Sequence, residues 1–135
     1  MRMQTKIAAF GALVLVALST VTVMALFDDA EGPLIYEVDI LPVSPKGGDM
    51  IIVSAYCIDA SGVSSAKMSW SINEAGWVEQ DMVFYACLCL AGGRWIASFG
   101  PVSASDTVRL YVTAYDSTPG HNSANTQTFQ LQIAT

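Results

Sequence analysis

The sequence predicts an all-β domain preceded by one apolar helix, on three observations. The first is an uncharged apolar run from Ile7 to Phe27, long enough for a helix of roughly 30 Å. The second is the lack of any helical period after Pro33, where short alternating segments recur between Gly, Pro, Asn and Ser turns. The third is the size of this second part, about 100 residues, which suits one compact domain.

Charges flank the apolar run asymmetrically. Arg2 and Lys6 precede it, and the acidic residues Asp28, Asp29 and Glu31 follow it. Positive charge before the run and negative charge after it predict a cytoplasmic N-terminus and an exported remainder. The chain therefore divides into an N-terminal helix over residues 1–27, an acidic hinge over 28–33 and a β-domain over 34–135.

The apolar run has two interpretations. As a retained helix, it lies in a membrane or in the core of a filament, where Ala8 and Ala12 offer a small-residue contact between helices. As a cleaved leader, it uses the small residues around Val23-Met24-Ala25 for processing. Its apolar length exceeds the ~7–15 residues usual for the core of a leader, which favours the retained helix.

Eight segments of the β-domain are predicted as strands. In one of them Met68, Trp70 and Ile72 share one face and serines share the other, as in a half-buried antiparallel strand. The strands are expected at Leu34–Leu41, Met50–Ile58, Ala66–Ile72, Trp77–Met82, Val83–Leu90, Arg94–Phe99, Thr107–Tyr115 and Thr126–Ala134. The core is expected to include Val53, Ala55, Met68, Trp70, Ile72, Val112 and Ala114.

Turn residues separate these strands. Asp59 and Asp116 each follow a strand and are expected to bond the backbone N–H groups of the next turn. The segment Ala91-Gly92-Gly93-Arg94 is expected to supply positive φ for a tight hairpin. The last strand, Thr126–Ala134, is expected to pair within its own sheet, with strand addition by a neighbouring chain as the alternative.

The three cysteines are Cys57, Cys87 and Cys89. Because Cys87 and Cys89 are two apart in a strand-like segment, they point the same way and are poorly placed to bridge each other. Cys57 with one of them is the plausible disulfide in an exported domain, and three buried thiols are the alternative. No metal site is expected, because the chain has no C-x-x-C and a single histidine, His121, in a polar turn.

Composition excludes several functions. The formal net charge is −6 and only 13 % of residues are charged, so no basic face can form for nucleic acid. With His121 in a turn, no buried acid is placed to complete a Ser–His–acid triad. The acidic residues fall mainly in turns, where capping or solvation explains them. We therefore expect no enzyme activity and no cofactor.

Two stretches resemble immunoglobulin-like and fibronectin-type-III-like domains of prokaryotic, including archaeal, surface proteins. Residues Ile52–Val63 are similar to the second strand and following turn of that family, and Asp106–Asp116 to its penultimate strand. The resemblance implies an immunoglobulin-like antiparallel β-sandwich, with Trp70 spaced from Cys57 as the core tryptophan is from the first cysteine. The penultimate strand has no cysteine, so the resemblance does not imply an antibody-type disulfide.

A looser resemblance is to archaeal pilin-like subunits, which pair an apolar helix with a β-sandwich head. It implies a non-enzymatic, exported structural protein of a cell-surface assembly. This is either a subunit of a pilus-like filament or a membrane-anchored adhesion or envelope domain, whose partners are copies of itself or other surface proteins. The alternative is a small ligand- or carbohydrate-binding accessory module using exposed aromatics such as Trp77, Trp95, Tyr85 and Tyr111. A secreted monomer without its leader is a third possibility.

Overall fold

The computed structural model describes residues 32–86 and 92–135 as one β-domain. The apolar run Ile7–Phe27, with Ala8 and Ala12, and the hinge up to residue 31 lie outside the described residues. In the described part, no helix is long and apolar enough to cross a membrane. The nine strands are β1 (Leu34–Leu41), β2 (Ile51–Ile58), β3 (Val63–Ile72), β4 (Val78–Asp81), β5 (Val83–Ala86), β6 (Gly92–Phe99), β7 (Thr107–Asp116), β8 (Ser123–Asn125) and β9 (Phe129–Gln132).

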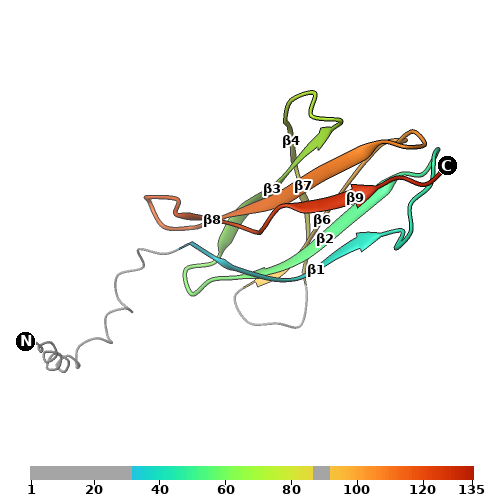
Figure 1. Ribbon diagram of the computed structural model, residues 1–135. Coiled ribbons are helices and arrows are strands. Elements are labelled where there is room, and N and C mark those ends of the chain that lie inside the picture. The colour runs from blue at the N-terminus through green and yellow to red at the C-terminus, as the bar shows by residue number, and fades with distance from the viewer. Residues whose placement is uncertain (1–31, 87–91) are drawn as a thin grey trace, which may run out of the picture. The chain divides into compact units, whose positions relative to one another are not determined.

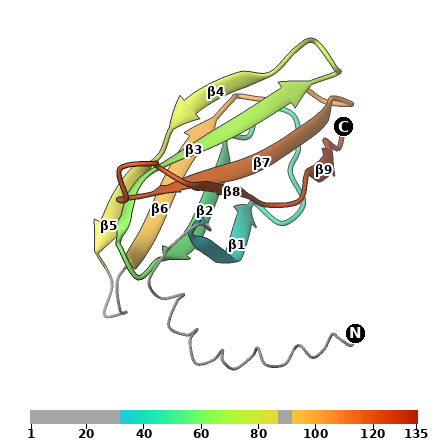
Figure 2. The ribbon, with the colours of Figure 1, turned by 90° about the vertical axis from the view of Figure 1, so that its left-hand side faces the viewer.

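The strands form two antiparallel sheets that lie as two layers (Figures 1 and 2). One sheet has the order β1-β2-β6-β5, and the other has the order β4-β3-β7-β8, with β9 also paired to β7. Each buries its inner face, because alternate residues of a strand point to opposite sides. The predicted all-β class is thus confirmed, as a β-sandwich.

The core between the sheets is built from the alternating residues of the long strands. Ile51, Val53, Ala55 and Cys57 of β2 are fully buried, and β3 and β7 contribute the inward side chains that face them. Among the residues expected in the core, Val53, Ala55, Met68, Val112 and Ala114 are buried, and Trp70 and Ile72 pack against the cluster while partly exposed.

The chain passes from one sheet to the other at Met82. Strand β4 ends at Asp81 beside β3, and β5 begins at Val83 beside β6, so a single buried residue separates strands of different sheets. The amide of Met82 donates to the Ala66 carbonyl, which fixes the crossing to β3. Alternation alone predicts two strands here, but it does not indicate that they belong to opposite layers.

The final predicted strand, Thr126–Ala134, is wrong in its extent. Strand β8 ends at Asn125 opposite Thr113, and β9 begins at Phe129 opposite Leu110, so three residues face two on β7. This is a bulge in the β7 ladder. The Thr126 hydroxyl accepts from the Val112 amide at 3.0 Å, so a side chain takes over a ladder position and displaces the following backbone. The prediction that this segment pairs within its own sheet is confirmed for β9.

The glycine pair before Arg94 differs from the expected tight turn. Gly92 and Gly93 lie inside β6. A side chain at Gly93 would overlap the ring of Phe84 and come within 2.9 Å of the Tyr85 carbonyl oxygen. Gly93 is therefore needed for close packing of β5 on β6 rather than for a positive φ.

Candidate functional site

The outer face of the β4-β3-β7-β9 layer carries an aromatic cluster near the β3–β4 hairpin. Trp77 directly precedes β4 and is 46 % exposed. Its ring meets that of Tyr111 edge-on, with centroids 5.1 Å apart, and the Arg109 guanidinium lies 5.2 Å from the Trp77 centroid. Serines make room for these side chains, since Ser69 lies opposite Tyr111 and Ser71 opposite Arg109. We call Trp77, Tyr111 and Arg109 the Trp77 cluster.

A hollow of ≈ 370 Å³ adjoins the Trp77 cluster. It is lined by Asn73, Glu74, Thr107, Arg109 and Gln130. The β3–β4 hairpin supplies two of these residues, with Asn73 and Glu74 both in the left-handed region at φ 53° and 61°. Strands β7 and β9 supply the others, and Arg109 lies directly opposite Gln130.

The hollow has a fixed frame and free polar groups. Asn73 is held in place because its amide donates to Asp106 and its side-chain oxygen accepts from the Thr107 amide, both at 2.9 Å. In the part of the chain that the structure describes, no hydrogen bond or ion pair engages the side chains of Glu74, Arg109 or Gln130. An amide, a carboxylate and a guanidinium thus converge beside an exposed tryptophan.

The Ser71 hydroxyl is a further unsatisfied group at this face. It is buried, lies opposite Arg109 and has no hydrogen-bond partner among the described residues.

The outer face of the β1-β2-β6-β5 sheet is different in chemistry. One row runs across all four strands in register, from Tyr36 through Tyr56 and Arg94 to Tyr85. The rings of Tyr36 and Tyr56 are stacked, with centroids 5.7 Å apart. Around the row lie large apolar side chains that are half-buried or exposed: Leu34, Leu41, Ile52, Ile58, Val83 and Ile96. We call this surface the Tyr56 face.

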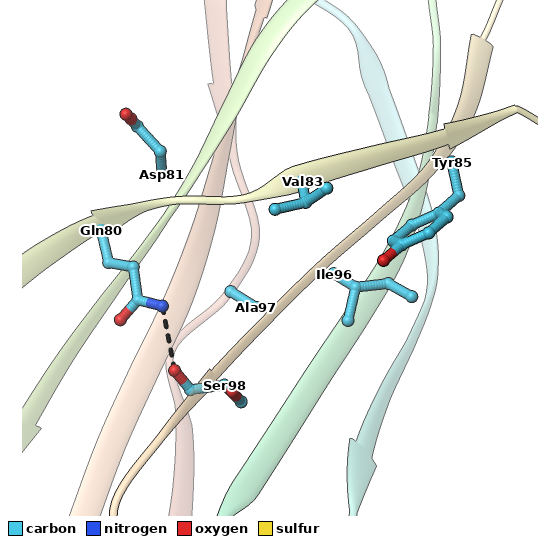
Figure 3. Close-up of a pocket in the computed structure, with 7 residues that line it drawn as sticks. All are labelled: Gln80, Asp81, Val83, Tyr85, Ile96, Ala97 and Ser98. Atoms are coloured by element: carbon cyan, nitrogen blue, oxygen red, sulfur yellow. Dashed lines mark hydrogen bonds between the residues drawn. The ribbon is translucent and has the colours of Figure 1, made fainter.

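A smaller hollow of ≈ 270 Å³ opens where the chain leaves β4 for β5 (Figure 3). Val83, Tyr85 and Ile96 line one side of it. Beyond Ile96, β6 has lost β5 as a neighbour, and the Gln80 amide instead donates to the Ser98 carbonyl at 2.9 Å. The hollow thus results from the crossing of the chain between the sheets at Met82, and the Gln80–Ser98 hydrogen bond lies along one side of it.

The two turn aspartates act as predicted. The Asp59 carboxylate accepts from the amide and hydroxyl of Ser61. Asp116 is fully buried, and one of its oxygens accepts from the Thr118 amide and hydroxyl and from the Asn122 amide at 2.7–3.1 Å. Burial raises the pKa of Asp116, but the hydrogen bonds from Thr118 and Asn122 outweigh it and leave the pKa below its ordinary value.

Other sequence candidates fall in places that bring no reactive set together. His121 lies in the turn after β7, with Nδ1 3.4 Å from the Asp116 carbonyl oxygen. Within residues 32–86 and 92–135, no three His, Cys, Asp or Glu side chains gather as a group that could hold a metal ion. Cys57 is buried and has no disulfide partner among the described residues, and burial raises the pKa of its thiol to about 12. Cys87 and Cys89 lie outside the described residues, so the disulfide stays a prediction.

Of the four aromatics expected to be exposed, the structure brings two together. Trp77 and Tyr111 form the Trp77 cluster, whereas Tyr85 lies on the other sheet. Trp95 is wrong as a surface candidate, because it is 7 % exposed and packs against Phe84 in the sandwich. The sequence around Arg109 gives no sign of this role, since only the folded structure places its guanidinium over the Trp77 ring.

No family model and no curated protein matches the chain. Among solved structures, a Br derivative of BhCBM56 aligns with a TM-score of 0.49 at 12 % identity, covering 75 % of this chain and 98 % of that one. A carbohydrate-binding module family 56 β-1,3-glucan binding domain aligns with a TM-score of 0.46 at 14 % identity, covering 73 % and 99 %. At these identities and TM-scores, neither alignment indicates what this chain binds.

Proposed function

We propose that this protein is a non-enzymatic, exported binding module that takes a carbohydrate on the Trp77 cluster. The observation that carries this proposal is the half-exposed Trp77 ring, positioned by Tyr111 and Arg109. It lies beside a hollow in which the side chains of Glu74, Arg109 and Gln130 have no hydrogen bond or ion pair among the described residues. Small-molecule sites combine apolar and aromatic surface with a few placed polar groups. A sugar presents C–H groups on one face and hydroxyls around its edge, which suits both parts.

Each group has a distinct part in this proposal. The Trp77 ring supplies apolar area for the sugar face, and Tyr111 limits its motion. Glu74 accepts from ligand hydroxyls, Arg109 donates, and Gln130 does both. Asn73 stays in the frame, because its amide is already bonded to Asp106 and Thr107.

We further propose that the sandwich is of the immunoglobulin-like type. Its support is the strand order β1-β2-β6-β5, which corresponds to strands A, B, E and D of that fold, and the order β3-β7-β8, which corresponds to C, F and G. Strand β4 then adds one strand beside C. The retained N-terminal helix and the surface location belong to this proposal too, on the charge pattern around Ile7–Phe27.

A subunit of a cell-surface assembly, such as a pilus-like filament, is the second candidate function. The observation that favours it is the Tyr56 face, an outer sheet surface made largely of apolar and aromatic side chains. Surfaces of this kind mark protein–protein contacts. The two candidates use opposite sheets and are compatible in one molecule.

Carbohydrate binding is tested by affinity electrophoresis of the full chain through gels that contain a panel of soluble polysaccharides. At least one polysaccharide should retard the wild-type chain, and Trp77→Ala should weaken that binding by at least about tenfold. Val43→Ala is the control, because Val43 is 85 % exposed and belongs neither to the Trp77 cluster nor to the Tyr56 face. Retardation by none of the polysaccharides, or equal retardation of Trp77→Ala and wild type, would overturn the proposal.

A further inference from the structure

We infer that the Tyr56 face joins two copies of this chain face to face around a two-fold axis. This inference is independent of carbohydrate binding and gives the second candidate function its partner. The face is unlike the rest of the surface, since large apolar residues such as Ile52, Val83 and Tyr85 remain about half exposed on it. The opposite outer face carries the Trp77 cluster among serines and the ion pair of Lys67 with Asp81 at 2.8 Å.

The order of side chains in the central row is self-complementary. The row reads Tyr36, Tyr56, Arg94, Tyr85 across the four strands. A two-fold axis that runs parallel to the strands, between β2 and β6, places the same row of a second copy opposite this one in the reverse strand order. Tyr36 then faces Tyr85 of the other copy, and Arg94 faces the ring of Tyr56, which are an aromatic pair and a cation–π pair. A symmetric contact requires such self-matching of one surface patch.

Charge also favours a second copy as the occupant. The chain is acidic, with a net charge of −6, so two copies repel wherever carboxylates meet. Two carboxylates lie on β1 at the edge of this sheet, those of Glu37 and Asp39, and the aromatic row holds Arg94. The inferred axis sets β1 of one copy against β5 of the other, so these carboxylates of the two copies lie at opposite edges of the contact. The other acidic residues of the described part lie in turns, on β4 or in the core: Asp49, Asp59, Glu74, Glu79, Asp81, Asp106 and Asp116. This approach therefore keeps the carboxylates of the two copies apart.

The area suits a weak, reversible contact. Three strands of eight residues and one of four, about 4.8 Å apart with ~3.3 Å rise per residue, present roughly 440 Å² per copy. Two copies together therefore bury roughly 900 Å², which is the size of a transient interface. The aromatic row lies inside this face rather than at its rim, which is where binding energy concentrates in an interface.

The first test is sedimentation velocity of the full chain in one mild detergent over a concentration series. We expect a reversible dimer whose dissociation constant rises at least about tenfold in Ile52→Lys, because a lysine charge is placed in the apolar contact. Val78→Lys is the control, since Val78 is 45 % exposed on β4 and Ile52 is 42 % exposed. A monomer at all concentrations, or a dimer that a folded Ile52→Lys leaves unchanged, would refute the inference.

A second test uses disulfide cross-linking to check which residues of the two copies face each other, and it introduces no charge into the contact. Tyr36→Cys and Tyr85→Cys are made separately in a chain whose Cys87 and Cys89 are serines. Mixed and oxidised, the two variants should give a cross-linked dimer that neither gives alone, because Tyr36 of one copy faces Tyr85 of the other. Absence of the mixed product, or equal cross-linking of one variant with itself, would contradict this geometry. Trp77→Ala should leave both tests unchanged, which separates this inference from carbohydrate binding.

Discussion

The ring of Trp70 stacks on the ring of Phe99, with centroids 4.7 Å apart and planes 8° apart. Trp70 belongs to β3 and Phe99 to β6, so this contact joins the two sheets. It lies close to the end of β6 that β5 does not cover.

The stacking predicts a large loss of stability in Phe99→Ala. Phe99 is almost fully buried, and removal of a buried phenylalanine ring leaves a cavity that costs about 3–5 kcal/mol. Urea denaturation measures the loss. Phe84→Ala is the control, because Phe84 is half exposed and should lose less than half as much. Equal losses in the two variants would mean that the Trp70 contact does not join the sheets as described.

Asp116 predicts a specific dependence of stability on pH. Its pKa is lower in the folded protein than in the unfolded chain, so its contribution is complete above the ordinary carboxyl pKa and is lost as the pH falls through the folded value. Asp116→Asn should lower the melting temperature at pH 7 and flatten its decrease between about pH 4 and pH 2. Asp81→Asn, at an exposed ion pair, should leave that slope nearly unchanged. Parallel melting curves for wild type and Asp116→Asn would contradict the assignment.

Cys57 is predicted to be inert in the native protein. Its thiol is fully buried and its pKa is about 12, so on the order of one molecule in 10⁴ carries the thiolate at pH 8. In a chain with Cys87 and Cys89 replaced by serine, a thiol reagent should label Cys57 only on unfolding. Labelling of the folded chain at the rate of a free thiol would show that β2 opens readily.

Gly93→Ala is predicted to destabilise the β5–β6 pair. A methyl group at this position overlaps the Phe84 ring and approaches the Tyr85 carbonyl oxygen, and the backbone partner cannot move away cheaply. Overpacking of this kind costs about 1–3 kcal/mol. Gly120→Ala is the control, since its nearest neighbour would be the Asn122 side chain at 3.7 Å and its cost should stay within about 0.5 kcal/mol. Thermal denaturation of both variants decides whether packing or flexibility matters at Gly93.

The strands could be predicted from the sequence because burial on one side imposes a period of two. Leu34–Leu41 was predicted with the bounds that β1 has, and the Met68, Trp70, Ile72 alternation identifies β3. What alternation does not contain is the partner of each strand. The crossing at Met82 depends on which sheet receives Val83, and the bulge at 126–128 depends on a Thr126 hydroxyl that competes with the backbone.

The candidate site was predictable only in part for the same reason. The sequence offers Trp77 and Tyr111 as exposed aromatics, yet 34 positions separate them and only the register of β3, β4 and β7 brings them into contact. Trp95 is also a tryptophan, and like Trp77 it follows a glycine within two residues and precedes a β-branched residue. Its strand turns it inward, which the polar and apolar pattern around the glycine pair does not reveal.

The outward positions of the Trp77 cluster and the Tyr56 face on opposite sheets have a geometric consequence. In a pair joined through the Tyr56 faces, the two tryptophan platforms point away from each other. Such a pair cannot place both platforms on one flat polymer surface, so pairing adds no avidity for a single chain. With both proposals in place, such a pair would bridge two separate polymers, and a multivalent glycan mixed with it should be cross-linked into a network.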